Sequence, residues 1–493
     1  MSLFSRSFWK DLLLTYSAEI IVMACAFLCQ GIVARLGGLE QLGVYLLLRR
    51  VAWCFLVPLS LGMTVALARC LPMCSGLPGV RVRWSLFGIG TASAFGALAM
   101  LAILSIRRPV AKLLLGSPEL RTFILPLALM VLGNLVHALL YGHFRGMLQM
   151  RYANSLQAIN FGFMPVLALL GVQRFGLAFC IDLMGLAMLG VSVIFLLPLL
   201  RTLVQTRTEA KNEKWLLRAA RSLFPYGLGR VPGFLIAGLL FALGPIWLAH
   251  RASLTDVAIY ALGLSFMRML GAFFGPLGVL VLPHLAGLIA RNEQDGIRKD
   301  LQLLFRSATL LGVFASLQAA VLSRTLLVIW LGTAPVSSGL FFVPLVLILP
   351  LYLAYEVLRS PIDAVSSIPY NTIALSAALA ALFVGVLGSS PVWLVASQVV
   401  AFTLLGAISI VVLGRLYKLR LFELRQWFWP SLLSLVALPI TWIVQRLFEK
   451  QFVTIGGYEM LLFVLFLATM KWSGNTPALG ARVTEPQGYK TAA

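Results

Sequence analysis

The chain has 493 residues, of which 60% are hydrophobic and 11% charged, and its formal net charge is +22. Soluble globular domains carry about 25% charged residues, so the composition excludes an ordinary soluble protein. Apolar runs of membrane-spanning length recur from end to end, without the strict alternation of β-barrel strands. The sequence therefore predicts an all-α polytopic membrane protein whose excess charge lies in basic loops rather than in a nucleic-acid site.

The apolar pattern predicts about 14 transmembrane helices. The first is a retained helix rather than a cleaved signal peptide, because its apolar part is long and contains Glu19. The last is short for a span. The predicted helices cover residues 11–34, 43–69, 85–106, 122–141, 154–172, 176–200, 223–249, 258–286, 303–322, 340–359, 371–388, 394–414, 427–445 and 458–472.

An internal repeat divides these helices into two lobes. The segment from Ala34 to Tyr45 has a counterpart from Ala249 to Tyr260, and each falls on a short external turn between two long helices. Repeats of this kind are common in transporters, whose substrate sites lie between the repeats near the midplane of the membrane. The expected divisions are an N-terminal six-helix lobe (1–200), a cytoplasmic linker (201–222), a C-terminal six-helix lobe (223–414), two extra helices (415–473) and a disordered cytoplasmic tail (474–493).

The basic loops predict the orientation. With the N-terminus inside, cytoplasmic segments hold about 25 of the 39 Lys and Arg residues and external segments about 10, as the positive-inside rule requires. An even number of helices then places the C-terminus in the cytoplasm as well. The polar stretch 201–222 is either an amphipathic helix on the inner leaflet or a solvated linker.

Four arginines fall inside predicted helices, where a charge facing lipid is costly. The helix boundaries place Arg268 about 15 Å deep, Arg49 and Arg50 about 10 Å below the external surface, and Arg230 about 10 Å above the cytoplasmic surface. These depths predict a single cationic cavity that runs from entrance to exit. The planar, permanently charged guanidinium suits a phosphate or pyrophosphate. Structural ion pairs and snorkelling to the interface are the alternatives.

The acidic residues inside helices are few. Glu19, Asp182 and Glu356 are candidates to bind a coupling proton or Na⁺, and they are equally candidates for counter-ions of the arginines. Both roles remain open. The six cysteines and four histidines are dispersed, so the sequence predicts no metal centre and no cofactor.

The segment FPYGLGRVPGF around Arg230 is rich in residues that weaken a helix, because proline removes a backbone donor and glycine lowers helix propensity. We expect a hinge there, with a static proline kink as the alternative. The predicted hinge residues are Pro225, Gly229, Pro232 and Gly233.

Three segments carry a resemblance to a known family: ARLGGLEQLGVY with the arginine pair after it, YGHFRGMLQMRYAN, and PLGVLVLPHLAGLIARNEQDG. In these segments the chain resembles the polysaccharide-export branch of the multidrug/oligosaccharidyl-lipid/polysaccharide exporter superfamily, and it looks like an O-antigen-type flippase. The resemblance extends to about Gly414. It implies two six-helix lobes around a central cavity that works by alternating access.

The resemblance also implies a substrate and a place in the cell. The substrate would be a polyprenyl-pyrophosphate-linked oligosaccharide, flipped from the inner to the outer leaflet of the bacterial inner membrane. Partners would include a polysaccharide polymerase and other export proteins. Related lipid II flippases bind pyrophosphate with cavity arginines, which matches the four arginines here in type and depth. Candidates for contact with the sugars are Tyr45, Asn134, His137, Asn160 and Tyr260, each of which is otherwise an interhelical hydrogen-bond residue.

Two further functions compete with a flippase. A cation-coupled multidrug exporter of the same superfamily would need an acidic or aromatic lining for its cationic substrates, and four arginines argue against it. A membrane polysaccharide polymerase or ligase would typically carry a long external loop with catalytic Arg and His, and the predicted external loops are short. The sequence therefore predicts a transporter and not an enzyme.

Overall fold

The computed structural model is helical almost throughout the residues that it describes, which are 6–74, 78–206, 215–290, 294–366, 368–419, 424–448 and 451–474. The middle of the predicted linker (207–214) and the predicted tail beyond Gly474 lie outside the described residues. Side chains 275–290 also lie outside the description, and they make up most of the segment PLGVLVLPHLAGLIARNEQDG.

The predicted all-α membrane architecture is confirmed. In the described residues, twelve helices are long and apolar enough to cross a membrane, and the number is thirteen if the pair Ser338–Leu347 and Leu349–Asp363, bent by 40°, forms one broken span. The predicted fifth span is also helical from Met150 to Leu169, although a π-helical stretch interrupts it. The expected number of about 14 is thus close to the observed one.

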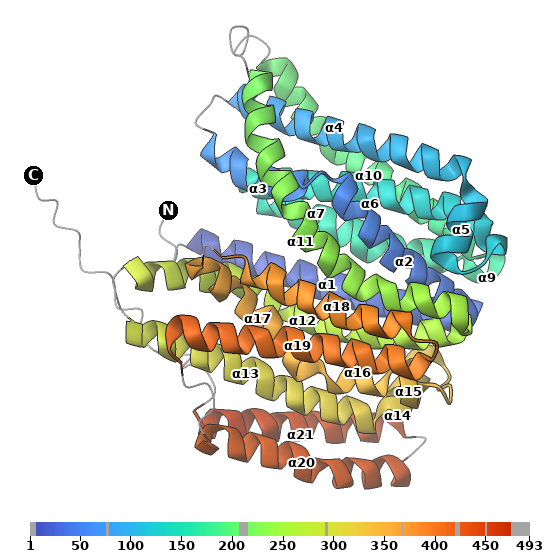
Figure 1. The fold of residues 1–493 in the computed structure, drawn as a ribbon, viewed down its shortest axis with the longest axis vertical. Helices are drawn as coiled ribbons and strands as arrows, with labels where there is room; N and C mark the ends of the chain where they lie inside the picture. Colours follow the sequence, from blue (N-terminus) through green and yellow to red (C-terminus); the bar gives the residue numbers. More distant parts are fainter. Residues whose placement is uncertain are drawn as a thin grey trace, which may run out of the picture.

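The first lobe, in the upper part of Figure 1, contains the helices up to α10. Several predicted spans are longer than expected or are followed by short helices such as α5 and α9. The elements are α1 (Arg6–Gly37), α2 (Leu39–Leu59), α3 (Met63–Met73), α4 (Pro78–Ser105), α5 (Arg107–Leu115), the 3-10 helix η1 (Pro118–Phe123), α6 (Ile124–Gly146), α7 (Met150–Gln157), the π-helix η2 (Ala158–Phe163), α8 (Met164–Leu169), α9 (Val172–Phe175) and α10 (Leu177–Gln205).

The second lobe lies below the first in Figure 1, and two further helices lie below the second lobe. Its elements are α11 (Trp215–Arg251), α12 (Leu254–Ala290), α13 (Gln294–Val321), α14 (Ser323–Leu331), α15 (Ser338–Phe341), α16 (Val343–Leu347), α17 (Leu349–Val365), α18 (Tyr370–Leu387) and α19 (Pro391–Tyr417), followed by α20 (Leu424–Leu447) and α21 (Phe452–Trp472).

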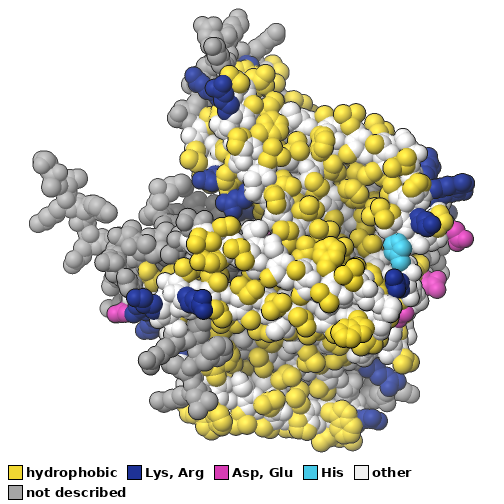
Figure 2. All heavy atoms as spheres, viewed as in Figure 1, with side chains coloured by type: hydrophobic (Ala, Val, Ile, Leu, Met, Phe, Trp, Pro, Cys, Tyr) yellow, Lys and Arg dark blue, Asp and Glu magenta, His cyan; other side chains and the backbone are white. Residues whose placement is uncertain are grey.

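The exposed surface has the character of a membrane protein. Figure 2 shows a broad apolar belt between two ends of the molecule at which the lysines and arginines gather. The extra helices α20 and α21 contribute to this belt, and they pack on α13 through a small apolar cluster. Within it Phe314 and Phe466 stack with ring centroids 4.5 Å apart. The last helix, at 21 residues, is longer than the sequence predicted and is long enough to span the membrane.

The predicted single helix 43–69 is wrong, because the chain breaks between α2 and α3. Leu61 and Gly62 have φ values of 50° and 69°, in the left-handed region that favours glycine. A tertiary contact explains the break, since the backbones of Gly62 and Gly227 in α11 touch. A Cβ atom on Gly62 would lie 2.0 Å from the carbonyl oxygen of Gly227.

Helix α11 is unbroken over its 37 residues, including the predicted hinge with Pro225 and Pro232. Figure 1 shows that it curves as it runs from the first lobe toward α18 of the second. Its first half packs against α3 and α4, where Phe87 and Phe224 meet at 6.1 Å. A hinge motion at these residues stays a prediction.

Candidate functional site

A cavity of about 300 Å³ lies between the two lobes. Helices α1, α2, α6 and α10 of the first lobe contribute to its wall, together with the η2–α8 stretch. Helices α12 and α14 contribute from the second lobe. Both α2 and α12 begin at the same end of the molecule, where Gly43 lies close to the carbonyl oxygen of Leu254. The predicted turn at Gly38 and its counterpart before Leu254 thus lie close together.

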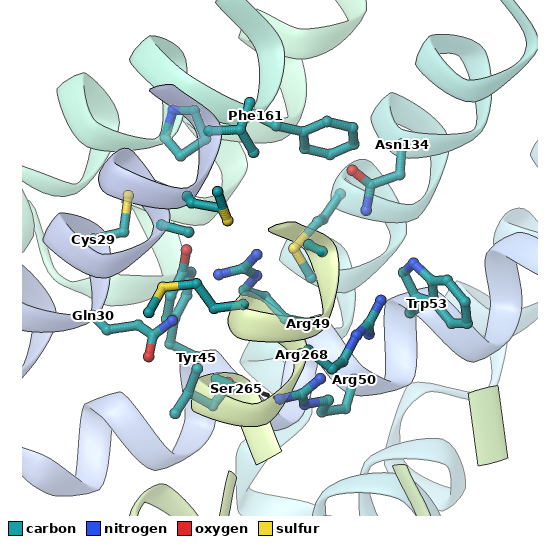
Figure 3. Close-up of a pocket in the computed structure, with 18 of the residues that line it drawn as sticks. Cys29, Gln30, Tyr45, Arg49, Arg50, Trp53, Asn134, Phe161, Ser265 and Arg268 are labelled. Carbon is teal, nitrogen blue, oxygen red and sulfur yellow. Dashed lines mark hydrogen bonds between the residues drawn. The ribbon is translucent and has the colours of Figure 1, made fainter. Parts of the chain in front are cut away.

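Three of the four predicted arginines line this cavity: Arg49 and Arg50 from α2, and Arg268 from α12 (Figure 3). Arg50 is only 8% exposed, and it ties the lobes together. Its guanidinium donates to the Ser265 hydroxyl at 2.7 Å and to the Ala261 carbonyl at 3.2 Å, both in α12. Arg49, next to it in sequence, points about 100° away around the helix. Its guanidinium lies over the ring of Tyr45 at 5.6 Å.

Aromatic rings hold Arg268. Its guanidinium carbon lies 4.7 Å from the ring centre of Trp53 in α2 and 5.1 Å from that of Phe241 in α11. The guanidinium of Arg50 also approaches the ring of Phe241, at 5.8 Å. Cation–π contacts orient a guanidinium while leaving its charge uncompensated. Two cationic groups are therefore fixed at the cavity wall from opposite lobes.

The cavity carries an excess of positive charge. Glu19 is the one acidic residue among the described residues that line it, and its carboxylate accepts a hydrogen bond from the Gln157 amide at 2.9 Å. Within the described part of the chain, Arg49, Arg50 and Arg268 have no ion-pair partner. An anion entering this low-dielectric space would be attracted by three guanidinium groups that form no ion pair with a described carboxylate, although Glu356 interacts electrostatically with Arg268.

Arg230 lies outside this cavity. It is exposed on α11, with its guanidinium over the ring of Tyr226 at 5.5 Å. Asp182 in α10 is half-buried and also lies outside the cavity. Glu356 in α17 pairs with Arg359 at 3.3 Å and accepts from the Tyr352 hydroxyl at 2.9 Å. Of the three acids, only Glu19 lines the cavity, whereas Glu356 lies outside it but close enough to Arg268 for an electrostatic interaction.

The five polar residues considered for sugar contacts separate into two groups. Tyr45 and Asn134 line the cavity. The other three make hydrogen bonds inside their own lobes. The Asn160 amide contacts His137 at 3.3 Å, and the Tyr260 hydroxyl donates to Gln398 at 2.8 Å. These three residues therefore form interhelical hydrogen bonds, which the sequence analysis gave as the alternative to sugar contacts.

The sequence analysis did not predict the aromatic and methionine residues that line the cavity. Trp53 follows Arg49 by four residues and so lies on the same face of the helix, and this spacing would have predicted it as a cavity residue. Phe161 comes from the π-helical stretch and Trp330 from α14, and no local pattern marks either residue. Five methionines also line the cavity: Met23, Met130, Met184, Met188 and Met269.

The lobes are closed at the end where α1 finishes. Trp330 stacks on Phe27 of α1 with ring centroids 4.1 Å apart, and its indole N–H donates to the Phe27 carbonyl at 2.8 Å. The Arg35 guanidinium donates to the carbonyls of Ile329 and Trp330. We call these α1–α14 contacts the Phe27–Trp330 latch. The predicted orientation would place it at the external surface.

Two helical lobes around a central cationic cavity, within an apolar belt, form an architecture that many membrane transporters share. Solved structures with the same fold include the lipid II flippase MurJ in an inward closed conformation, with a TM-score of 0.71 and 12% identity. The alignment covers 94% of this chain and 99% of MurJ.

Two MATE transporters, the first of them described as a multidrug resistance transporter, share the fold as well. An inward-facing MATE transporter of the MOP superfamily matches with a TM-score of 0.65 and 12% identity, over 83% of this chain and 98% of its own. A mutant form of the Vibrio cholerae MATE transporter VcmN matches with a TM-score of 0.57 and 15% identity, over 84% and 97%. No family model and no curated protein match by sequence. The chain therefore has the fold of MOP-superfamily transporters.

Proposed function

We propose that this protein flips a polyprenyl-pyrophosphate-linked oligosaccharide from the inner to the outer leaflet of the bacterial inner membrane by alternating access. The observation that carries the proposal is the cluster of Arg49, Arg50 and Arg268, which faces the cavity without an ion-pair partner among the described residues. A pyrophosphate diester carries about two negative charges, and guanidinium groups bind its oxygens bidentately. The fold shared with a lipid II flippase supports the same substrate class.

The membrane potential favours this direction of transport. Moving one elementary charge across 100 mV changes the free energy by about 2.3 kcal/mol, and an inside-negative potential drives anions outward. The bare transfer of a pyrophosphate through hydrocarbon remains prohibitive, so a cationic cavity is needed. A coupling proton or Na⁺, if the cycle uses one, would bind at Glu19.

The multidrug exporter is the second candidate, because the MATE transporters share the fold and the methionine wall would adapt to varied apolar shapes. Its cationic substrates would be repelled by three uncompensated arginines. The charge of the cavity therefore favours the lipid-linked anion.

The experiment compares the sidedness of lipid-linked glycan in cells that lack the protein and carry plasmid-borne variants. We expect Arg268→Ala and Arg49→Ala to leave the glycan on the inner leaflet although the protein inserts normally. Arg174→Ala is the matched control, because Arg174 is an exposed arginine that also lies over an aromatic ring, Phe175, at 5.3 Å. Wild-type sidedness in both cavity variants would refute the proposal.

A further inference from the structure

Helix α11 presents a second aromatic ring that two arginines share. The guanidinium carbon of Arg69 in α3 lies 4.4 Å from the ring centre of Tyr226, and that of Arg230 lies 5.5 Å from the same centre. Both arginines are exposed, and Tyr226 is half-buried. We call this group the Arg69–Tyr226–Arg230 cluster.

The cluster repeats the construction of the cavity. There Arg50 and Arg268 approach one ring, Phe241, at 5.8 Å and 5.1 Å. Tyr226 and Phe241 lie on the same helix, and the 15 residues between them correspond to about 22 Å along its axis. Helix α11 thus carries two stations, each with an aromatic ring and two guanidinium groups, one beside the cavity and one away from it.

A tight backbone seam fixes the position of the outer station. Gly227, next to Tyr226, touches Gly62 at the start of α3, and a Cβ atom on Gly227 would lie 2.7 Å from the carbonyl oxygen of Leu61. One turn before Tyr226, the carbonyl oxygen of Ser222 accepts a weak hydrogen bond from the Cys70 thiol at 3.9 Å. These contacts hold Arg69 beside Tyr226, so the two cations are brought together by packing.

No carboxylate in the described part of the chain pairs with these arginines, Arg69 and Arg230. Two like charges held near one ring repel each other, and a bound anion would relieve that repulsion. The planar guanidinium can stack on the ring and still direct its N–H edge outward to a phosphate.

The length of α11 places the cluster at a membrane surface. Arg230 precedes Arg251, the last residue of the helix, by 21 residues, or about 31 Å at 1.5 Å per residue. The hydrocarbon core is about 30 Å thick, so Arg230 lies at one interface when Arg251 lies at the other. In the predicted orientation this is the cytoplasmic side, where the head groups of inner-leaflet lipids lie.

We propose that the Arg69–Tyr226–Arg230 cluster is a separate binding site for a lipid-borne phosphate group at the mouth of the transport path, distinct from the cavity site. It receives the phosphate before the cavity arginines do. The transfer from one site to the other rests on the proposed function, whereas binding at the cluster does not.

The test counts binding sites for a defined probe, radiolabelled farnesyl pyrophosphate, on the full-length protein in phosphatidylcholine nanodiscs. We expect two sites on the wild type, and one on the double variant Arg69→Gln, Arg230→Gln. The matched control Arg174→Gln should keep both sites. Tyr226→Phe keeps the ring and should keep the outer site, whereas Tyr226→Leu should weaken it about tenfold. Gel filtration of each variant confirms that it is folded.

Two competitors identify the source of the phosphate. Displacement from the outer site by phosphatidylglycerol would assign it to anionic phospholipid, and resistance to it would assign the site to the polyprenyl pyrophosphate. Equal binding of inorganic pyrophosphate would overturn the requirement for a lipid. Two sites on the double variant would overturn the proposal altogether. A different result would show that the proposed function is wrong. In that case Arg268→Gln would keep both binding sites, because the cavity arginine would not bind the pyrophosphate.

Discussion

Arg268 is the cavity cation with the most ring contacts, because its half-buried guanidinium has two aromatic rings against it and no ion-pair partner among the described residues. Trp53 of the first lobe and Phe241 of the second both contact the guanidinium. The Trp53 ring also packs close to the backbone of α11, since a Cβ atom on Gly238 would lie at an ordinary contact distance of 3.4 Å from it. Trp53 is therefore a positioning residue for Arg268.

We predict that Trp53→Leu weakens binding of a pyrophosphate-bearing substrate by about tenfold while the protein remains folded. The loss corresponds to a cation–π contact of about 1–2 kcal/mol in a desolvated site. Equilibrium binding of the same farnesyl pyrophosphate probe measures the change. Trp393→Leu is the control, because Trp393 is 64% exposed on α19. An unchanged dissociation constant in Trp53→Leu would remove the positioning role.

Glu19 differs from the other two acids in its surroundings. Because only Glu19 lines the cavity, we predict that Glu19→Gln abolishes the response of transport to an imposed proton or Na⁺ gradient. Glu356→Gln and Asp182→Asn should keep that response. Uptake into proteoliposomes with and without a gradient measures it. A retained gradient response in Glu19→Gln would show that the residue is only a counter-ion.

The sequence identified Arg49, Arg50 and Arg268 as cavity residues because charge inside an apolar run is rare and depth follows from helix rise. It placed Arg230 in the cavity from its depth along the helix alone, and depth does not say which side of the helix a residue faces. Arg230 lies on an exposed side of α11, over the ring of Tyr226. The ring contacts of Trp53 depend on how distant helices pack, which no local pattern contains.

Among the elements, the α2–α3 break shows how tertiary structure overrides propensity. The segment from Gly43 to Arg69 reads as one apolar run, and Gly62 alone is weak evidence for a break. The decisive contact is with Gly227, more than 160 residues later in the chain. Helices α18 and α19 were predicted to within a few residues because no such contact interrupts them.

We predict that Gly62→Ala destabilises the protein by about 2 kcal/mol or more, because the left-handed conformation alone costs a non-glycine residue about 1–2 kcal/mol. The added Cβ atom would also collide with Gly227, at 2.0 Å from its carbonyl oxygen. Thermal unfolding in detergent measures the effect. Gly90→Ala is the matched control, since a Cβ atom at Gly90 of α4 meets nothing within 4 Å. Equal melting temperatures for both variants would contradict the account of the seam.

At the scale of the whole molecule, the proposed transport by alternating access would require the closed end to open. The Phe27–Trp330 latch joins α1 to α14. At the same end α11 meets α5, because Nε2 of His250 lies 2.9 Å from the carbonyl oxygen of Lys112. These contacts must separate before a substrate in the cavity can leave there.

We predict that a short bifunctional thiol cross-linker between Phe27→Cys and Trp330→Cys, in a background without the native cysteines, stops transport. Binding at the cavity should persist, because the latch is already closed in this conformation. Transport in proteoliposomes before and after cleavage of the cross-link gives the readout, and the two single-cysteine variants are the controls. Continued transport by the fully cross-linked protein would mean that this end does not open.

The unbroken course of α11 has a mechanical consequence. The first half of this helix packs on α3 at the Gly62–Gly227 seam and on α4 through Phe224 and Phe87, and the helix also packs on α18 of the second lobe. If the lobes move relative to each other, α11 cannot slide along its axis, because it packs on both of them. The helix itself would then have to bend. Pro225, Pro232 and Pro245 lie inside the helix and donate no backbone hydrogen bond, so we expect any bending to occur near them. The stiffness of α11, as well as the charge of the arginines, would then set the rate at which the cavity arginines and the Arg69–Tyr226–Arg230 cluster become accessible to substrate in turn.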